Sequence, residues 1–114
     1  MEHDTKEWIA VQDLRNALDK KFGQDIAVID LRNVTTIADF FVIATGTSAP
    51  QLHALAETTE EIMKLHEIPI RHIEGIRGGQ WILLDFGSVI VHLFDNESRQ
   101  FYNLERVWGD AKMV

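Results

Sequence analysis

The segment from residue 80 to residue 94 constrains the fold most, because it predicts two adjacent strands with a defined register. Apolar runs at 80–85 and 89–94 are separated by Gly87 and Ser88, which is the pattern of a hairpin. With those two residues in the turn, the expected cross-strand pairs are Asp85 with Ile90, Leu83 with His92 and Trp81 with Phe94. Asp85 and His92 then become diagonal neighbours, close enough to interact.

Side chains alternate between the two faces of this hairpin, and the two faces differ in chemistry. One face is wholly apolar and is predicted to be core: Ile82, Leu84, Phe86, Val89, Val91 and Leu93. The other face mixes aromatic and hydrogen-bonding groups: Trp81, Leu83, Asp85, Ile90, His92 and Phe94. This mixture is typical of the centre of a protein interface. Two interpretations stay open: a helix covers this face, with His92 satisfied inside and Asp85 serving the turn, or the face docks a partner.

The chain before the hairpin predicts a helix followed by two strands. Apolar residues recur every three or four positions from residue 4 to residue 23, with Asp4 and Glu7 in the spacing of a capping box. The expected buried stripe consists of Trp8, Val11, Leu14, Leu18 and Phe22. The segments 25–31 and 39–46 predict buried strands, and their short connection favours antiparallel or close neighbours.

A second helix is expected from Ser48, its N-cap, to about Glu67, and a third strand at 70–74. A strand, a helix and a strand in this order favour a parallel crossover. A last short helix is expected after the hairpin, with Asn96 as its N-cap. The whole chain, residues 1–114, is therefore predicted to be one α/β domain with a mixed sheet of about five strands and flanking helices.

Composition excludes several classes of function. The chain has 114 residues and no cysteine, so disulfides, thiolate metal sites and cysteine nucleophiles are excluded. Its formal charge of −7 disfavours direct nucleic-acid binding and favours a basic partner. No signal peptide, transit peptide or bilayer-spanning run is visible, so a cytoplasmic protein that does not contact membranes is expected.

A nucleotide-using enzyme is the alternative from another class. The turn at Gly46, Thr47 and Ser48 leads from a strand into a helix, where backbone N–H groups bind phosphate in many proteins. Metal-dependent phosphoryl transfer also needs paired carboxylates, and Gly87 stands where a partner of Asp85 on the same face would lie. The histidines form no ligand cluster in the sequence. We therefore expect no metal, no cofactor and no enzymatic activity.

Three segments in this order resemble the Iojap-related ribosome silencing factors, the RsfS family: DFFVIATGTS, GGQWILLDFGSVIVHLF and RQFYNLERVWGDA. The resemblance covers about residues 10–111. It implies a nucleotidyltransferase-like α/β fold without the catalytic carboxylates. It also implies a repressor of translation under nutrient limitation, which binds the large ribosomal subunit through the ribosomal protein called L-fourteen and blocks joining of the small subunit.

The resemblance and the mixed face of the hairpin together predict a partner-binding site. Trp81 and Phe94 are expected as aromatic anchors, and Asp85 and His92 as polar groups that specify the contact. Arg99 and Tyr102 are expected to form a neighbouring part of this site. A homodimeric adaptor that uses the same face on a second copy remains an alternative.

Overall fold

A mixed β-sheet is the middle layer of the molecule, as seen in a computed structural model that describes residues 5–78, 80–109 and 111–114. In these residues six strands are ordered β3-β4-β5-β2-β1-β6 across the sheet. The elements in chain order are α1 (Lys6–Lys20), β1 (Gln24–Asp30), β2 (Phe40–Thr45), α2 (Ala49–Leu65), β3 (His72–Glu74), β4 (Trp81–Asp85), β5 (Val89–Phe94), α3 (Asn96–Tyr102), α4 (Leu104–Val107) and β6 (Lys112–Met113).

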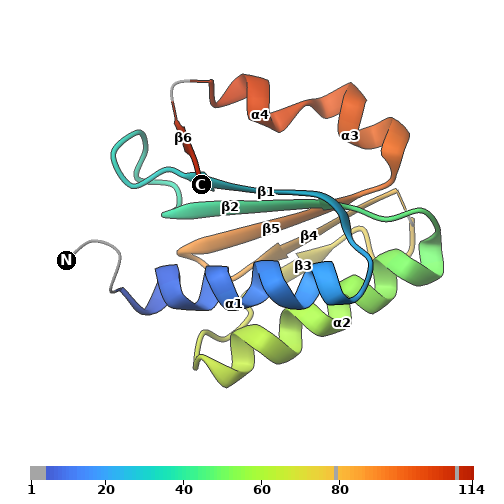
Figure 1. Cartoon of the computed structure of the whole chain (residues 1–114), viewed down its shortest axis with the longest axis horizontal. Coiled ribbons are helices and arrows are strands. Elements are labelled where there is room, and N and C mark those ends of the chain that lie inside the picture. The colour runs from blue at the N-terminus through green and yellow to red at the C-terminus, as the bar shows by residue number, and fades with distance from the viewer. Residues whose placement is uncertain (1–4, 79, 110) are drawn as a thin grey trace.

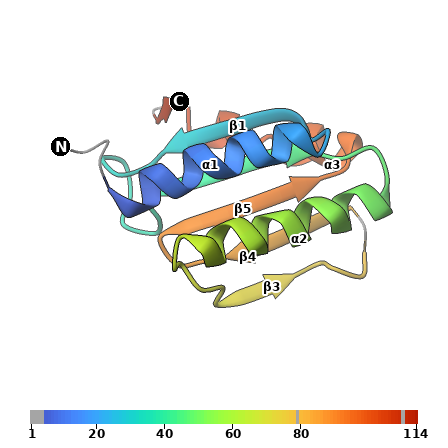
Figure 2. The same cartoon turned by 60° about the horizontal axis from the view of Figure 1, so that its bottom comes forward.

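Helices cover the two faces of the sheet unequally. The long helices α1 and α2 lie side by side on one face, and the short helices α3 and α4 lie on the opposite face (Figures 1 and 2). The first interface contains the aliphatic face of the hairpin, as predicted, together with residues of both long helices: Ala10, Val11, Leu14, Leu18, Leu52, Leu55, Ala56 and Met63. A smaller cluster lies under the short helices: Ile29, Leu31, Ala38, Phe41, Ile43 and Phe94.

The strand pairing confirms the predicted register. β4 and β5 pair antiparallel, with Asp85 opposite Ile90, Leu83 opposite His92 and Trp81 opposite Phe94. β1 and β2 are antiparallel neighbours, as their short connection predicts. β2 pairs parallel with β5, which places β5 in the centre of the sheet. The directions of the intervening pairs make β3 parallel to β2, as the expected crossover requires.

Several boundaries differ from the prediction. The sheet has a sixth strand, because Lys112 and Met113 pair with β1; a strand this short is defined by its partner and carries no periodicity of its own. The N-cap of α3 is Asp95, whose carboxylate accepts a hydrogen bond from the Ser98 amide, and not Asn96.

The two ends of α1 also differ from the prediction. Thr5 caps its first turn by accepting a hydrogen bond from the Trp8 amide, and the expected Asp4 lies outside the described residues. Phe22 is 80% exposed, because α1 ends at Lys20 and the backbone turns left-handed at Phe22. The expected buried stripe therefore ends one turn earlier, at Leu18.

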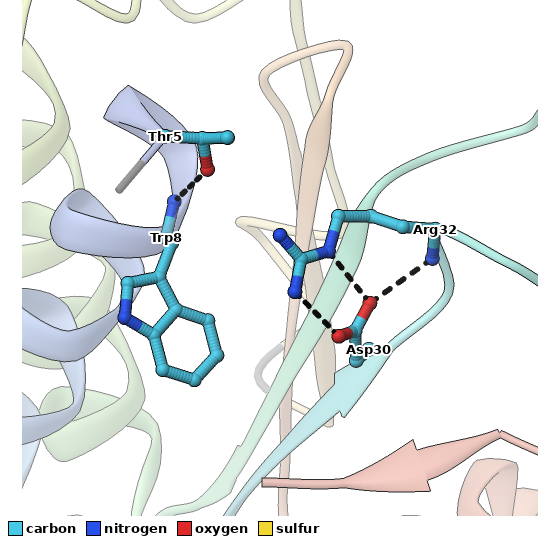
Figure 3. Close-up of polar contacts among 4 residues, drawn as sticks. All are labelled: Thr5, Trp8, Asp30 and Arg32. Atoms are coloured by element: carbon cyan, nitrogen blue, oxygen red, sulfur yellow. Dashed lines mark hydrogen bonds and ion pairs between the residues drawn. The ribbon is translucent and has the colours of Figure 1, made fainter. Parts of the chain in front are cut away.

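An ion pair between Asp30 and Arg32 at the end of β1 lies beside the start of α1 (Figure 3). The Asp30 carboxylate accepts hydrogen bonds from the backbone amide, Nε and Nη2 of Arg32, at 3.1, 3.0 and 2.7 Å. The Arg32 guanidinium also lies 5.7 Å from the centre of the Trp8 ring and 4.8 Å from that of Phe40. The hydrogen bonds from Arg32 lower the pKa of Asp30 although burial opposes them.

Two leucines of α2 provide a test of this layer arrangement. Leu55 is fully buried between the helix and the sheet, whereas Leu65 is 75% exposed. Leu55→Ala should lower the free energy of unfolding by about 2–5 kcal/mol, because it leaves a cavity. Leu65→Ala should change it by less than about 0.5 kcal/mol. Denaturant titrations measure both, and equal losses would contradict the placement of α2.

Candidate docking surface

The second face of the sheet is only half covered, and this leaves a surface beside the short helices. Leu104 and Trp108 pack on the buried cluster over β1, β2 and β5. Over β4, Leu83 and Asp85 remain partly exposed, and β3 at the sheet edge is largely exposed. This open half and the adjoining end of α3 are called the docking surface below.

Trp81 is the centre of an aromatic cluster at the boundary between the covered and open halves. Its ring centre lies 4.6 Å from that of Tyr102, 5.3 Å from that of Phe94 and 5.9 Å from that of His92. Tyr102 in turn contacts Phe101 edge-on at 5.1 Å. Phe94 is fully buried, whereas Tyr102 is 42% and Phe101 81% exposed, so the cluster runs from the core to the surface.

His92 lies inside this cluster and is almost completely buried. Its Nδ1 accepts a hydrogen bond of 3.2 Å from the Trp81 indole Nε1–H, so the neutral ring carries its proton on Nε2. No acceptor for that Nε2 proton lies among the described residues. Burial lowers the pKa of His92 from 6.5 to about 4, since a charged imidazolium would lose its hydration there.

Asp85 serves the hairpin turn. Its Oδ1 accepts a hydrogen bond of 2.7 Å from the Gly87 amide, where φ is +84° and favours glycine. Asp85 and His92 therefore use separate hydrogen-bond partners, although the register makes them diagonal neighbours. Further along the same face, a hollow of about 130 Å³ is lined by Glu74, Gly75, Trp81 and Leu83.

Arg99 holds the helical layer against the sheet. Its Nε and Nη2 donate to Glu105, the shortest contact being 2.8 Å, and its Nη1 donates to Thr45 Oγ1 at 2.9 Å. Only 11% of the Arg99 side chain is exposed. Burial, the largest single effect, would raise the pKa of Glu105, but the Arg99 hydrogen bond, a backbone hydrogen bond and the Arg99 charge together lower that pKa. The pair thereby connects α3, α4 and the end of β2.

The structure brings the six predicted site residues into one neighbourhood but gives them different positions. Trp81, Asp85 and Tyr102 reach the surface. Phe94 is fully buried beneath Trp81, so its ring does not reach the surface, and its role as an aromatic anchor stays a prediction. A helix covers the Phe94 end of this face, as the first interpretation expects, and the Trp81 end is partly exposed. That a partner docks on the exposed end stays a prediction.

His92 and Arg99 differ from Trp81 in their surroundings, and their roles as contact residues stay predictions. Both side chains are largely buried and hold hydrogen bonds within the chain, which suits support of the surface better than direct contact. Phe101 was not among the predicted site residues. The sequence does carry a signal for it, because neighbouring residues of a helix point about 100° apart. Two consecutive aromatics, Phe101 and Tyr102, therefore indicate that one of the rings faces solvent.

The turn at Gly46, Thr47 and Ser48 resembles a phosphate loop in sequence, but its polar groups form hydrogen bonds with other groups of the chain. Gln51 Oε1 accepts hydrogen bonds from the amide and hydroxyl of Thr47, and Ser48 Oγ accepts from the Gln51 amide. The Gly46 amide donates to the carbonyl of Phe94. This arrangement is that of a capped helix start. In the described part of the chain, no three histidine or carboxylate side chains converge on a common point.

Comparison with known proteins decides the family. Residues 3–114 match the model of the family described as "Ribosomal silencing factor during starvation", RsfS. The chain belongs to this family. The resemblance seen in the three sequence segments is thereby confirmed.

Within the described ranges, no helix is long and apolar enough to cross a bilayer.

Relatives of this RsfS-family chain span bacteria and organelles. It is 37% identical over 99 residues to "Ribosomal silencing factor RsfS" of Halalkalibacterium halodurans, covering 87% of this chain and 85% of the other. It is 35% identical to mouse "Mitochondrial assembly of ribosomal large subunit protein 1", covering 83% of this chain but 43% of that longer protein.

A crystal structure of a protein from Chromobacterium violaceum matches with a TM-score of 0.80 at 33% identity, covering 87% of this chain and 83% of the other. These comparisons support the predicted α/β fold. The likeness to nucleotidyltransferases stays a prediction.

The burial of neutral His92 makes stability depend on pH. The unfolded imidazole takes up its proton near pH 6.5, but the folded one does so only near pH 4, so acid favours the unfolded chain. Between about pH 7 and pH 5 the free energy of unfolding should fall by about 2 kcal/mol from this residue. Denaturant unfolding at both pH values, with His92→Phe as the control that removes the effect, measures this term. The same pH dependence in both proteins would contradict it.

Proposed function

We propose that this RsfS-family protein represses translation by occupying the large ribosomal subunit, so that the small subunit is blocked from joining. The observation that carries the proposal is the docking surface, on which exposed aromatic rings adjoin an uncovered stretch of sheet. Family membership supports the target, because relatives are named as ribosomal silencing factors and one as a protein of large-subunit assembly. Exposed aromatic residues next to a hollow are typical of the energetically dominant part of an interface.

The ribosomal protein L-fourteen is the proposed contact on the large subunit. The chain has a formal charge of −7, and Glu74 and Asp85 lie on the docking surface itself. Complementary charge accelerates encounter with a basic partner. It also disfavours binding to bare RNA, whose phosphates repel the domain. Raising the ionic strength should therefore slow association with the partner.

Within this surface we assign different roles to the predicted residues. Trp81 and Tyr102 are the proposed contact residues, joined by Phe101 at the exposed end of α3. Asp85 specifies the contact from the turn of the hairpin. Arg99 keeps the helical layer in place through Glu105 and Thr45. In this proposal the protein acts by tight occupancy and bulk in the cytoplasm, without a chemical step or a cofactor.

Binding to the ribosome tests the surface directly. Trp81→Ala should remain folded and lose at least about thirtyfold in affinity for purified large subunits, because a central aromatic anchor typically contributes about 2 kcal/mol or more. Co-sedimentation measures the affinity. Phe22→Ala is the matched control, because Phe22 is 80% exposed and its carbonyl accepts a hydrogen bond from Gln51 at the start of α2, a helix that packs on the opposite face of the sheet (Figure 2). Wild-type affinity of a folded Trp81→Ala protein would contradict the docking surface.

Subunit joining tests the activity. Added wild-type protein should shift joined ribosomes toward free subunits in a gradient profile, and Trp81→Ala should not.

Binding to isolated L-fourteen tests whether this ribosomal protein, and not another part of the large subunit, is the partner. If the protein binds large subunits but not L-fourteen, the partner is wrong while the docking surface stands. Saturable binding of ATP with magnesium, together with group transfer, would favour the enzyme alternative. Light scattering shows whether a second copy competes for the same surface.

A further inference from the structure

The orientation of the Trp81 indole is set by one hydrogen bond inside the protein. The indole has a single donor, Nε1–H, and that donor is used by His92 Nδ1 at 3.2 Å. The two residues lie on adjacent strands and are not directly opposed, since Trp81 faces Phe94 and Leu83 faces His92. The bond therefore runs diagonally across the hairpin and fixes which edge of the indole points inward.

The acceptor is itself held rigidly. The His92 ring meets Phe41 edge-on with centres 4.9 Å apart, and lies parallel to Phe94 at 6.0 Å with an angle of 6°. It is 5% exposed, so close packing on all sides limits the rotation that would take Nδ1 away from the indole. A buried acceptor of this kind limits the movement of a side chain that is itself partly exposed.

A purely packing role does not explain a histidine at this position. The Nε2–H of its neutral ring finds no acceptor among the described residues, and an unpaired buried donor destabilises a fold. Phenylalanine would fill the same space without that unpaired group. What the imidazole adds is the Nδ1 acceptor for Trp81.

We infer that His92 is a positioning residue, which locks the Trp81 indole in the orientation that a partner binds, and that it makes no partner contact itself. The inference rests on the proposed function, because it assigns a role within the same docking surface. It differs from the expectation of a polar contact residue, since the imidazole acts through the indole. Preorganisation of this kind strengthens binding by removing the entropy that a free side chain loses on docking.

Nuclear magnetic resonance of the free, nitrogen-15-labelled protein tests the hydrogen bond without any partner. The expected spectra show a neutral His92 with its proton on Nε2, and a Trp81 indole proton that exchanges slowly with water. His92→Phe should keep the packing but speed the exchange of that proton. His92→Asn should slow the exchange again, because its amide oxygen can replace Nδ1. A ring protonated on Nδ1 in the free protein overturns the inference.

Binding to large subunits tests the consequence. His92→Phe should be at least as stable to denaturant as the wild type, yet bind about three- to tenfold more weakly. His92→Asn should bind more tightly than His92→Phe although it leaves a cavity, which a merely structural role would not produce. Wild-type affinity of His92→Phe, with binding lost in Trp81→Ala, overturns the inference and leaves the proposed function standing. Wild-type affinity of Trp81→Ala overturns the proposed docking surface and the positioning role with it.

Discussion

The alternation of side chains along β4 and β5 is the constraint on which the rest of the structure depends. It sends an aliphatic row toward α1 and α2, where burial of apolar surface supplies most of the stability of the fold. The same alternation sends Trp81, His92 and Phe94 to the other face. That face cannot be closed in the same way, because α3 and α4 are short and pack over β1, β2 and β5.

This unequal covering explains how one sheet combines stability with recognition. The first face is covered by α1 and α2 and needs no partner to bury it. On the second face, Arg99 ties the short helices to Thr45 and so fixes where the covered half ends. Trp81 lies at that boundary, with Phe94 beneath it and Tyr102 beside it. An aromatic ring that packs on a buried neighbour with one face and is exposed on the other loses little conformational entropy when it is bound.

Much of the fold was predictable, because local patterns specify it. The alternation of side chains and the two-residue turn predicted the register of the hairpin, and the observed strand pairing confirms that register. The cap of α3 and the end of α1 were less predictable, because neighbouring residues such as Asp95 and Asn96 have similar capping propensities. The strand at Lys112 was not predictable, since two residues form a strand only when β1 lies beside them.

The candidate site shows the same division. The sequence by itself determined that Trp81, Asp85, His92 and Phe94 share one face, because the period of a strand is two residues. Only the tertiary structure decided that Phe94 is buried and Trp81 partly exposed. Exposure depends on where the short helices pack, which is a long-range contact without a signal in strand periodicity. The tertiary structure also decided the hydrogen bond between the Trp81 indole and the His92 imidazole, because this bond requires both rings to be confined by neighbours that are distant in the chain.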